Sequence, residues 1–265
     1  MKKLFFSVLA TLIMGIGSIA SAQQLTGLQI MKENDKQFDF KTEVSDMTME
    51  LINSSNKKRS RTVERFSMKD DAGLLSTLIK FLQPADVKGS GFLSVENSKD
   101  DETRYLYLPA LRKSRRISTG EDSDSFMGSD FTYEDIDEMV MEDYSFKLIG
   151  SETINGTDCH KVEAVPSNEE RKKISGYSKS IYYVSKDNFI VNKVDFYDKH
   201  GELFKILKGT NIKAVPGTTN FYRAYTLTME NLKTKHKTIL SYSNIHINTD
   251  VDEEMFSVRM LERGN

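Results

Sequence analysis

The residue types that carry most enzyme chemistry are few in this sequence and lie apart from one another. The four histidines, His160, His200, His236 and His246, occur singly, and no H-E-x-x-H or G-x-S-x-G motif is present. Cys159 and His160 are neighbours in an extended segment, so their side chains point to opposite faces and cannot form a nucleophile and base pair. A single cysteine also excludes an internal disulfide and every multi-cysteine metal site. We therefore expect a protein that is not an enzyme and that uses neither cofactor nor metal.

A run of basic residues between Pro109 and Ile117 is the second group that could act chemically. It contains Arg115 and Arg116, which we assign to an anionic contact with a lipid headgroup, a membrane surface or an acidic partner. Adjacent residues of a strand face opposite sides, so the two arginines can grip one phosphate only where the backbone twists or breaks this alternation. Pro109 makes such an irregularity reasonable. The alternative interpretation is a charged face exposed to solvent.

Apolar side chains recur at every second residue in several segments, and they suggest a third kind of chemistry, the binding of an apolar ligand. The chain has 12 methionines and 15 phenylalanines but no tryptophan, and methionine adapts to variable apolar shapes. Such side chains either pack as core or line a cavity, and both outcomes are open at this point. The inward face of each strand is an assumption, because a shift of one residue inverts it. The residues predicted to line one cavity for fatty acyl chains are Met47, Met49, Leu51, Leu93, Tyr105, Tyr107, Phe126, Phe131 and Met139.

The N-terminus has the pattern of a secretory signal peptide. Lys2 and Lys3 precede an apolar run that ends in Ala20, Ser21 and Ala22, so we expect cleavage after Ala22. Residues 1–22 would be the signal and residues 23–265 a single domain of the exported protein. The 37 basic and 39 acidic side chains nearly cancel, which excludes a nucleic-acid binder that relies on bulk positive charge.

Alternation of period two dominates the rest of the chain and predicts a mainly β protein. Short polar breaks such as Asn155-Gly156 and Pro216-Gly217 favour hairpins over crossover helices. We expect one strongly curved antiparallel sheet of about eleven strands, long enough to curl upon itself. Helical spacing of apolar residues and capping residues predict helices near residues 26–36 and 131–141, on the concave side of the sheet.

Four blocks of the sequence, in order, resemble a known family. They are Gln83–Leu93, Tyr107–Leu111, Arg115–Ile117 and Ser125–Asp135. These blocks look like the motifs of the outer membrane lipoprotein-sorting protein family, a LolA-like group of bacterial periplasmic proteins. The order and spacing of four blocks is more specific than any single motif, and the resemblance extends to the whole mature chain.

The resemblance implies a half-open β-barrel with helices at its mouth, which carries acyl chains through the periplasm from the inner towards the outer membrane. The implied partners are lipid or lipoprotein acyl chains, an inner-membrane exporter such as a large lipid exporter, and an outer-membrane acceptor. We expect a monomer that does not bind nucleic acid. The alternative is a regulatory module that senses lipids or lipoproteins for a membrane partner. Known sensors of this type carry a further C-terminal domain, whereas residues 252–256 here look like a short closing turn.

Overall fold

Thirteen antiparallel strands form one sheet in the computed structural model, which describes residues 24–98 and 101–263. The predicted signal peptide, residues 1–22, lies outside these residues. The order of the strands across the sheet is β6-β5-β4-β3-β2-β1-β13-β12-β11-β10-β9-β8-β7, so β6 and β7 are its two edges and the sheet is not closed. The strands are β1 (Thr42–Ile52), β2 (Lys58–Lys69), β3 (Leu75–Gln83), β4 (Gly91–Ser98), β5 (Asp101–Leu108), β6 (Lys113–Ile117), β7 (Tyr144–Ile154), β8 (Thr157–Pro166), β9 (Lys179–Ser185), β10 (Val191–Tyr197), β11 (Leu203–Ala214), β12 (Tyr222–Asn231) and β13 (His236–Ile247).

The hairpin turns follow the chemistry of their residues. Asn155 and Gly156 alone join β7 to β8, and both have positive φ, 49° and 84°, as a two-residue type I′ turn requires. The strongly curved, open antiparallel sheet predicted from the sequence is confirmed, with 13 strands rather than about eleven. The edge strand β7 is half-buried or exposed along its whole length. Apolar and polar residues alternate clearly in a sequence only where one face of the strand is buried. Since no residue of β7 is fully buried, the sequence gives only a weak signal for this strand.

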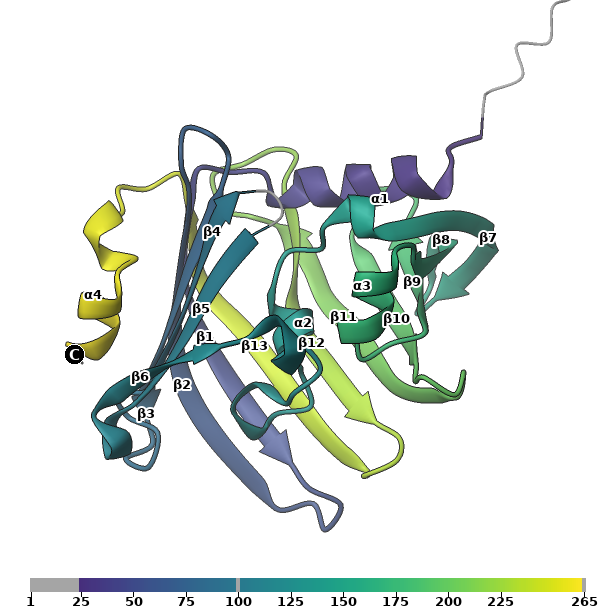
Figure 1. Ribbon diagram of the computed structural model, residues 1–265. Helices are drawn as coiled ribbons and strands as arrows, with labels where there is room; N and C mark the ends of the chain where they lie inside the picture. Colours follow the sequence, from purple (N-terminus) through teal and green to yellow (C-terminus); the bar gives the residue numbers. More distant parts are fainter. Residues whose placement is uncertain (1–23, 99–100, 264–265) are drawn as a thin grey trace, which may run out of the picture.

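Helix α1 (Gly27–Asp35) confirms the first predicted helix. A capping box between Thr26 and Gln29 starts it, and the short 3₁₀ turn η1 (Lys36–Phe38) continues it. Ile30 and Met31 are buried and pack on Val162 of β8 and on β9. Figure 1 shows α1 across one end of the curved sheet, on its concave side.

The second predicted helix is wrong over most of its length. Only α2 (Tyr133–Ile136), with Thr132 as its cap, is α-helical between residues 131 and 141, and a 3₁₀ turn begins at Met141. Asp137 adopts an extended conformation (φ −78°, ψ 159°), and its carboxylate accepts a hydrogen bond from Arg104 of β5. A buried ion pair therefore ends the helix after one turn, although the spacing of Ile136, Met139 and Val140 is helical.

Residues 119–143, which we call the plug segment, connect β6 to β7 and lie inside the curve of the sheet (Figure 1). Phe126 is fully buried in the central core cluster, where its ring meets Phe92 of β4 edge to face at 5.4 Å. Tyr133 of α2 packs on Phe126 at 5.7 Å. Aromatic packing of this kind fixes the middle of the plug segment against the sheet.

The convex face also carries an apolar cluster. Leu78 and Leu93 are buried beneath Leu261 of the C-terminal helix α4 (Val258–Glu262). The backbone at Gly91 lies so near this helix that a Cβ there would stand 2.6 Å from Leu261 Cδ1. Helix α3 (Glu169–Ile174) is the remaining α-helix of the described residues and packs near β8. Short 3₁₀ turns are η2 (Pro109–Leu111), η3 (Thr119–Glu121), η4 (Phe126–Gly128), η5 (Met141–Asp143) and η6 (Glu253–Met255).

Candidate functional site

A cavity of about 380 Å³ lies between the plug segment, α1 and the concave face of the sheet. It is more than twice the size of the ~150 Å³ engineered apolar cavity that stays dry and binds benzene. The apolar side chains that line it are Met31, Phe38, Phe40, Met47, Met49, Leu75, Ile79, Phe126, Phe131, Ile136, Met139, Met141, Ile190, Val191, Val194, Leu207, Ala224, Leu227, Leu240 and Ile245.

Five of the predicted cavity residues lie together around this space. Met47 and Met49 come from β1, Phe126, Phe131 and Met139 from the plug segment, and all five line the cavity. Alternation in β1 places Met47 opposite Val63 of β2, and this pair faces the plug segment. Their contact with an acyl chain stays a prediction.

The other four predicted cavity residues lie elsewhere. Leu51 shares the concave face and packs on the central core cluster without lining the cavity. Leu93, Tyr105 and Tyr107 were assigned to the cavity wrongly, because all three belong to the convex cluster under α4. Leu93 and Tyr105 are cross-strand partners, so one register places both on the convex side.

Arg115 and Arg116 lie on the edge strand β6, and neither lines the cavity. The strand pairs with β5 in regular register, Arg115 opposite Leu106 and Arg116 opposite Tyr105, so the two side chains face opposite sides. A joint grip on one phosphate is therefore wrong for this conformation. Arg115 is half exposed and forms an ion pair with Glu121, which lowers the pKa of that carboxyl to about 2. A contact of either arginine with an anion at the sheet edge stays a prediction.

Charged side chains also line the cavity, and the sequence did not point to them. Glu43 of β1 accepts hydrogen bonds from Arg65 of β2 at 3.1 Å and from Arg223 of β12 at 3.3 Å. Burial lowers the pKa of Arg223, the carboxylate of Glu43 opposing this effect. One feature of the sequence could have indicated Arg65, because it occupies an inward-facing position of β2 between Val63 and Ser67.

Arg223 also holds the segment that follows α1. Its guanidinium donates a hydrogen bond to the backbone carbonyl of Gln37 and lies 4.0 Å from the ring centre of Phe38 and 4.7 Å from that of Phe40. The amide oxygen of Gln37 accepts a hydrogen bond from the backbone of Tyr222 at 3.0 Å. These contacts place Phe38 and Phe40 in the cavity wall.

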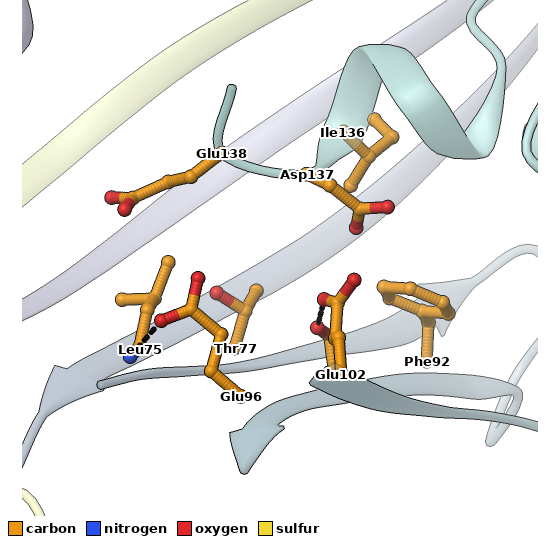
Figure 2. A pocket seen from close by; sticks show the side chains of 9 residues that line it. Leu75, Thr77, Phe92, Glu96, Glu102, Ile136, Asp137 and Glu138 are labelled. Carbon is orange, nitrogen blue, oxygen red and sulfur yellow. Dashed lines mark hydrogen bonds between the residues drawn. The ribbon is translucent and has the colours of Figure 1, made fainter. Parts of the chain in front are cut away.

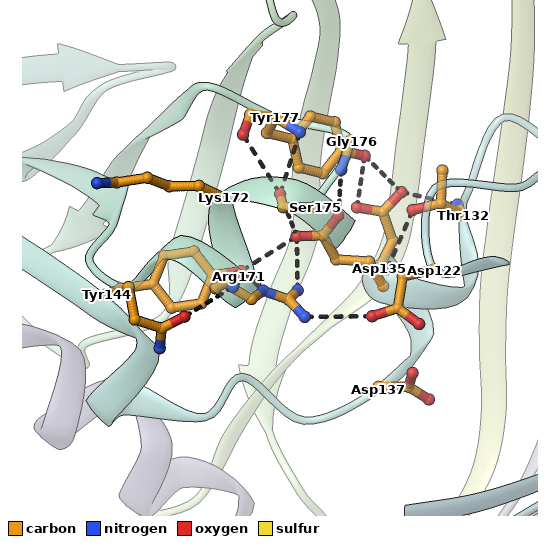
Figure 3. Close-up of polar contacts among 12 residues, drawn as sticks. Asp122, Thr132, Asp135, Asp137, Tyr144, Arg171, Lys172, Ser175, Gly176 and Tyr177 are labelled. Atoms are coloured by element: carbon orange, nitrogen blue, oxygen red, sulfur yellow. Dashed lines mark hydrogen bonds and ion pairs between the residues drawn. The ribbon is translucent and has the colours of Figure 1, made fainter. Parts of the chain in front are cut away.

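Polar contacts anchor the plug segment to the half of the sheet that contains β7 to β11 (Figure 3). Arg171 of α3 donates hydrogen bonds to Glu134 at 2.6 Å and to Asp122 at 3.2 Å. Asp135 accepts a hydrogen bond from the hydroxyl of Tyr177 at 2.8 Å, and burial raises the pKa of both groups.

The other half of the sheet holds the plug segment through Arg104 of β5. This guanidinium, only 3% exposed, donates to Asp122 at 2.5 Å and to Asp137 at 2.7 Å. Burial and the nearby carboxylate of Glu102 raise the pKa of Asp137 to about 8. Asp122 thus joins Arg104 to Arg171 and links the two halves of the sheet.

A second, small pocket lies beside Asp137 and is drawn in Figure 2. Its volume is about 10 Å³, and three further carboxylates, Glu96, Glu102 and Glu138, line it. That volume holds about one water molecule. Glu102 accepts a hydrogen bond from Ser94, and Glu96 accepts one from the backbone of β3. Among residues 24–98 and 101–263, no group of His, Cys, Asp and Glu is arranged to hold a metal ion.

Cys159 and His160 lie in different surroundings on β8. Cys159 is buried with Ile181 and Tyr183, while His160 stacks beside Phe189. The predicted separation of Cys159 and His160 on opposite faces of the strand is confirmed by the regular register of β8 with β9. Within the same described ranges, no helix is both long and apolar enough to cross a membrane.

Comparison with known proteins places the chain in a family. Residues 73–263 match the model of a family described as uncharacterised protein. An outer membrane lipoprotein-sorting protein domain from Vibrio parahaemolyticus is 32% identical, with a TM-score of 0.81, over 89% of this chain and 98% of that one. A DUF1329 family protein from Desulfovibrio piger is 26% identical, with a TM-score of 0.82, over 89% and 97%. The chain matches no curated protein at a significant level.

The chain belongs to the outer membrane lipoprotein-sorting protein family. Its fold is that of the LolA superfamily, since a LolA superfamily protein from Nitrosomonas europaea superposes with a TM-score of 0.70. That pair is 19% identical and is aligned over 89% of this chain and all of the other. The family resemblance found in the four sequence blocks is thereby confirmed.

Proposed function

We propose that this protein is a periplasmic carrier that shields the acyl chains of a lipid or lipoprotein in the 380 Å³ cavity during transfer from the inner towards the outer membrane. The observation that carries the proposal is the open apolar cavity between a curved sheet and a plug segment, in a chain of the lipoprotein-sorting family. The proposal includes export through the signal peptide of residues 1–22, an inner-membrane exporter as donor and an outer-membrane acceptor.

The energetics of acyl transfer explain why such a carrier needs a cavity and no catalytic group. Exposing a chain of about sixteen carbons to water costs roughly 12 kcal/mol, at about 0.8 kcal/mol per methylene. An apolar wall removes most of this cost, and flexible methionine side chains such as Met47, Met49 and Met139 adapt to chains of different shape.

Displacement of the neutral dye Nile red by a diacyl lipid tests the proposal. We expect wild-type protein to bind the dye in the cavity and to release it as lipid is added. Met139→Glu places a carboxylate in the cavity wall and should weaken lipid binding by about tenfold or more, because burying an unpaired charge costs several kcal/mol.

Met255→Glu is the matched control. Met255 is half-buried like Met139, yet it packs on the convex cluster under α4. This variant should bind dye and lipid as wild type does. Failure of lipid to displace the dye from wild type, or equal loss in both variants while both remain folded by circular dichroism, would refute the carrier function.

A further inference from the structure

Two guanidinium groups share a single carboxylate in the wall of the cavity. Arg65 and Arg223 both pair with Glu43, and the side chains are 23%, 8% and 6% exposed. Within the described ranges neither arginine has an ion pair with a second carboxylate. Arg65 and Arg223 therefore carry one positive charge more than Glu43 neutralises, in a cavity wall that also contains Lys69 and the carboxylates of Asp35, Asp135, Asp137 and Glu138. Of these carboxylates, Glu138 also interacts electrostatically with Arg65.

The donors of Arg223 are largely engaged by protein groups. Its Nη1 donates to the carbonyls of Gln37 and Tyr222, its Nη2 donates to Glu43, and its plane lies against Phe38. Arg223 thus contributes fixed positive charge to the cavity wall.

Arg65 makes hydrogen bonds to the described residues through only one of its guanidinium nitrogens. Its Nη1 alone makes both of its hydrogen bonds, to Glu43 at 3.1 Å and to Ser67 Oγ at 3.2 Å. A guanidinium carries five N–H groups in a planar fork that matches a pair of anionic oxygens. The Nε and Nη2 groups of Arg65 have no acceptor among the described residues, and Arg65 lines the cavity. These donors are placed to bind an anion that enters with an acyl chain.

Farther along β2, negatively charged side chains outnumber positively charged ones. Lys69 has Asp39 at 3.6 Å and Glu138 at 3.8 Å, and Asp35 also interacts with it electrostatically. Carboxylates outnumber the cation there, so an anionic group is disfavoured beside Lys69 and favoured beside Arg65. This polarity would orient a ligand that carries charge at one end.

We propose that the cavity selects amphiphiles with a single negative charge, a carboxylate or a phosphate monoanion, whose oxygens bind Arg65 while the acyl chain lies along the methionine-lined wall. The inference rests on the proposed carrier function and adds to it the chemical class of the cargo. Arg223 supports the site through its charge and by fixing Gln37 and Phe38 beside it.

Matched pairs of ligands that differ only in charge test this proposal. Palmitate and methyl palmitate compete with Nile red at pH 8 in one arm, and phosphatidylglycerol and diacylglycerol of the same chains in the other. Charge-assisted hydrogen bonds contribute about 1.5–3 kcal/mol, so the charged member should bind about tenfold or more tightly. A preference for palmitate over methyl palmitate alone identifies a fatty carboxylate as the ligand. A preference for phosphatidylglycerol over diacylglycerol identifies a phosphate headgroup.

Substitutions in β2 test whether the preference for the charged ligand depends on Arg65. Arg65→Met removes the charge and should bring the charged-to-neutral ratio near one while methyl palmitate binding is kept, which also reports on folding. Arg65→Lys keeps the charge opposite Glu43 without the fork and should retain a smaller preference. Arg59→Met, at an exposed position of the same strand, should behave as wild type.

The outcomes separate this inference from the carrier function. Equal affinity of wild type for charged and neutral ligands refutes the anionic site and leaves the carrier function standing. An unchanged preference in Arg65→Met places the selectivity elsewhere and also refutes it. Failure of every ligand to displace the dye refutes both proposals.

Discussion

Replacing Arg104 with methionine removes the cation that three carboxylates share. Arg104 lies 2.5 Å from Asp122, 2.7 Å from Asp137 and 3.8 Å from Glu102. Methionine keeps much of the apolar stem, so the loss reports mainly on charge and hydrogen bonding. Asp122 keeps Arg171 at 3.2 Å, whereas Asp137 and Glu102 have no ion pair with a second cation in the described part of the chain.

The size of the effect follows from the burial of these groups. Breaking a buried ion pair by removing one partner costs about 3–5 kcal/mol, because the other partner remains buried and charged. The cost falls if the carboxylates take up protons instead. We therefore expect the free energy of unfolding of Arg104→Met to depend on pH more steeply than that of wild type.

The direction of the pH dependence follows from the raised pKa values. Burial raises the pKa of Asp137 from 3.8 to about 8, and it raises that of Glu102. The folded state therefore binds protons more tightly than the unfolded state, so these groups favour folding at low pH and their contribution is lost as the pH rises from about 4 through about 8. Without Arg104 the two pKa values rise further. The variant should lose about 1 kcal/mol at pH 5, the net worth of its hydrogen bonds, and about 3–5 kcal/mol at pH 8.5.

Urea unfolding followed by circular dichroism at pH 5 and pH 8.5 measures both values. Arg115→Met is the control, since Arg115 forms a half-exposed ion pair with Glu121 and exposed pairs contribute about 0–1 kcal/mol. The control should change little between the two pH values. A loss of the same size at both pH values for Arg104→Met, or a loss under about 1 kcal/mol at pH 8.5, would show that Arg104 does not hold the plug segment by charge.

Three further predictions address packing and the lone thiol. Phe126→Ala should destabilise the fold by about 3–5 kcal/mol in urea unfolding, because the fully buried ring leaves a cavity; a loss under about 1 kcal/mol would contradict this. Gly27→Ala places a Cβ 2.9 Å from the backbone of β7 and should lower stability by about 1–3 kcal/mol, whereas Gly120→Ala meets nothing nearer than 3.8 Å and should cost far less. Cys159 is buried and burial raises the pKa of its thiol, so it should resist alkylation at pH 7.5 until urea unfolds the protein; prompt reaction of folded protein would place it at the surface.

The local sequence pattern was sufficient to predict the inward-facing residues of those strands in which only one face is apolar. In β1 the burial alternates, so Met47 and Met49 could be assigned to the concave face before the structure was known. In β4 both faces are apolar, because Phe92 faces the plug segment and Leu93 faces α4. Alternation cannot choose between two apolar faces, and this is why Leu93 and its cross-strand partner Tyr105 were assigned to the wrong side.

Long-range contacts decide the features that the sequence could not reveal. Glu43 and Arg223 are 180 residues apart, and only the pairing of β1 with β13 and of β13 with β12 brings them near each other. The plug segment has helical spacing of apolar residues up to Val140, yet the pairing of Asp137 with Arg104 takes the chain out of the helix. Tertiary contacts override local propensity in both cases.

The way in which the plug segment is held has a consequence for the cavity. Buried ion pairs add little net stability compared with apolar packing, but their geometry is specific. Asp122 is bound by Arg104 from one half of the sheet and by Arg171 from the other. This arrangement sets how far the plug segment stands from β1 and β2, and thus how much of the concave face stays uncovered. Phe126 and Phe131 of the plug segment already share one core cluster with Met47 and Met49, and an apolar plug could move farther towards the sheet and reduce the volume of the cavity. We expect the charged anchors to oppose this movement, because they cannot follow it without losing their partners.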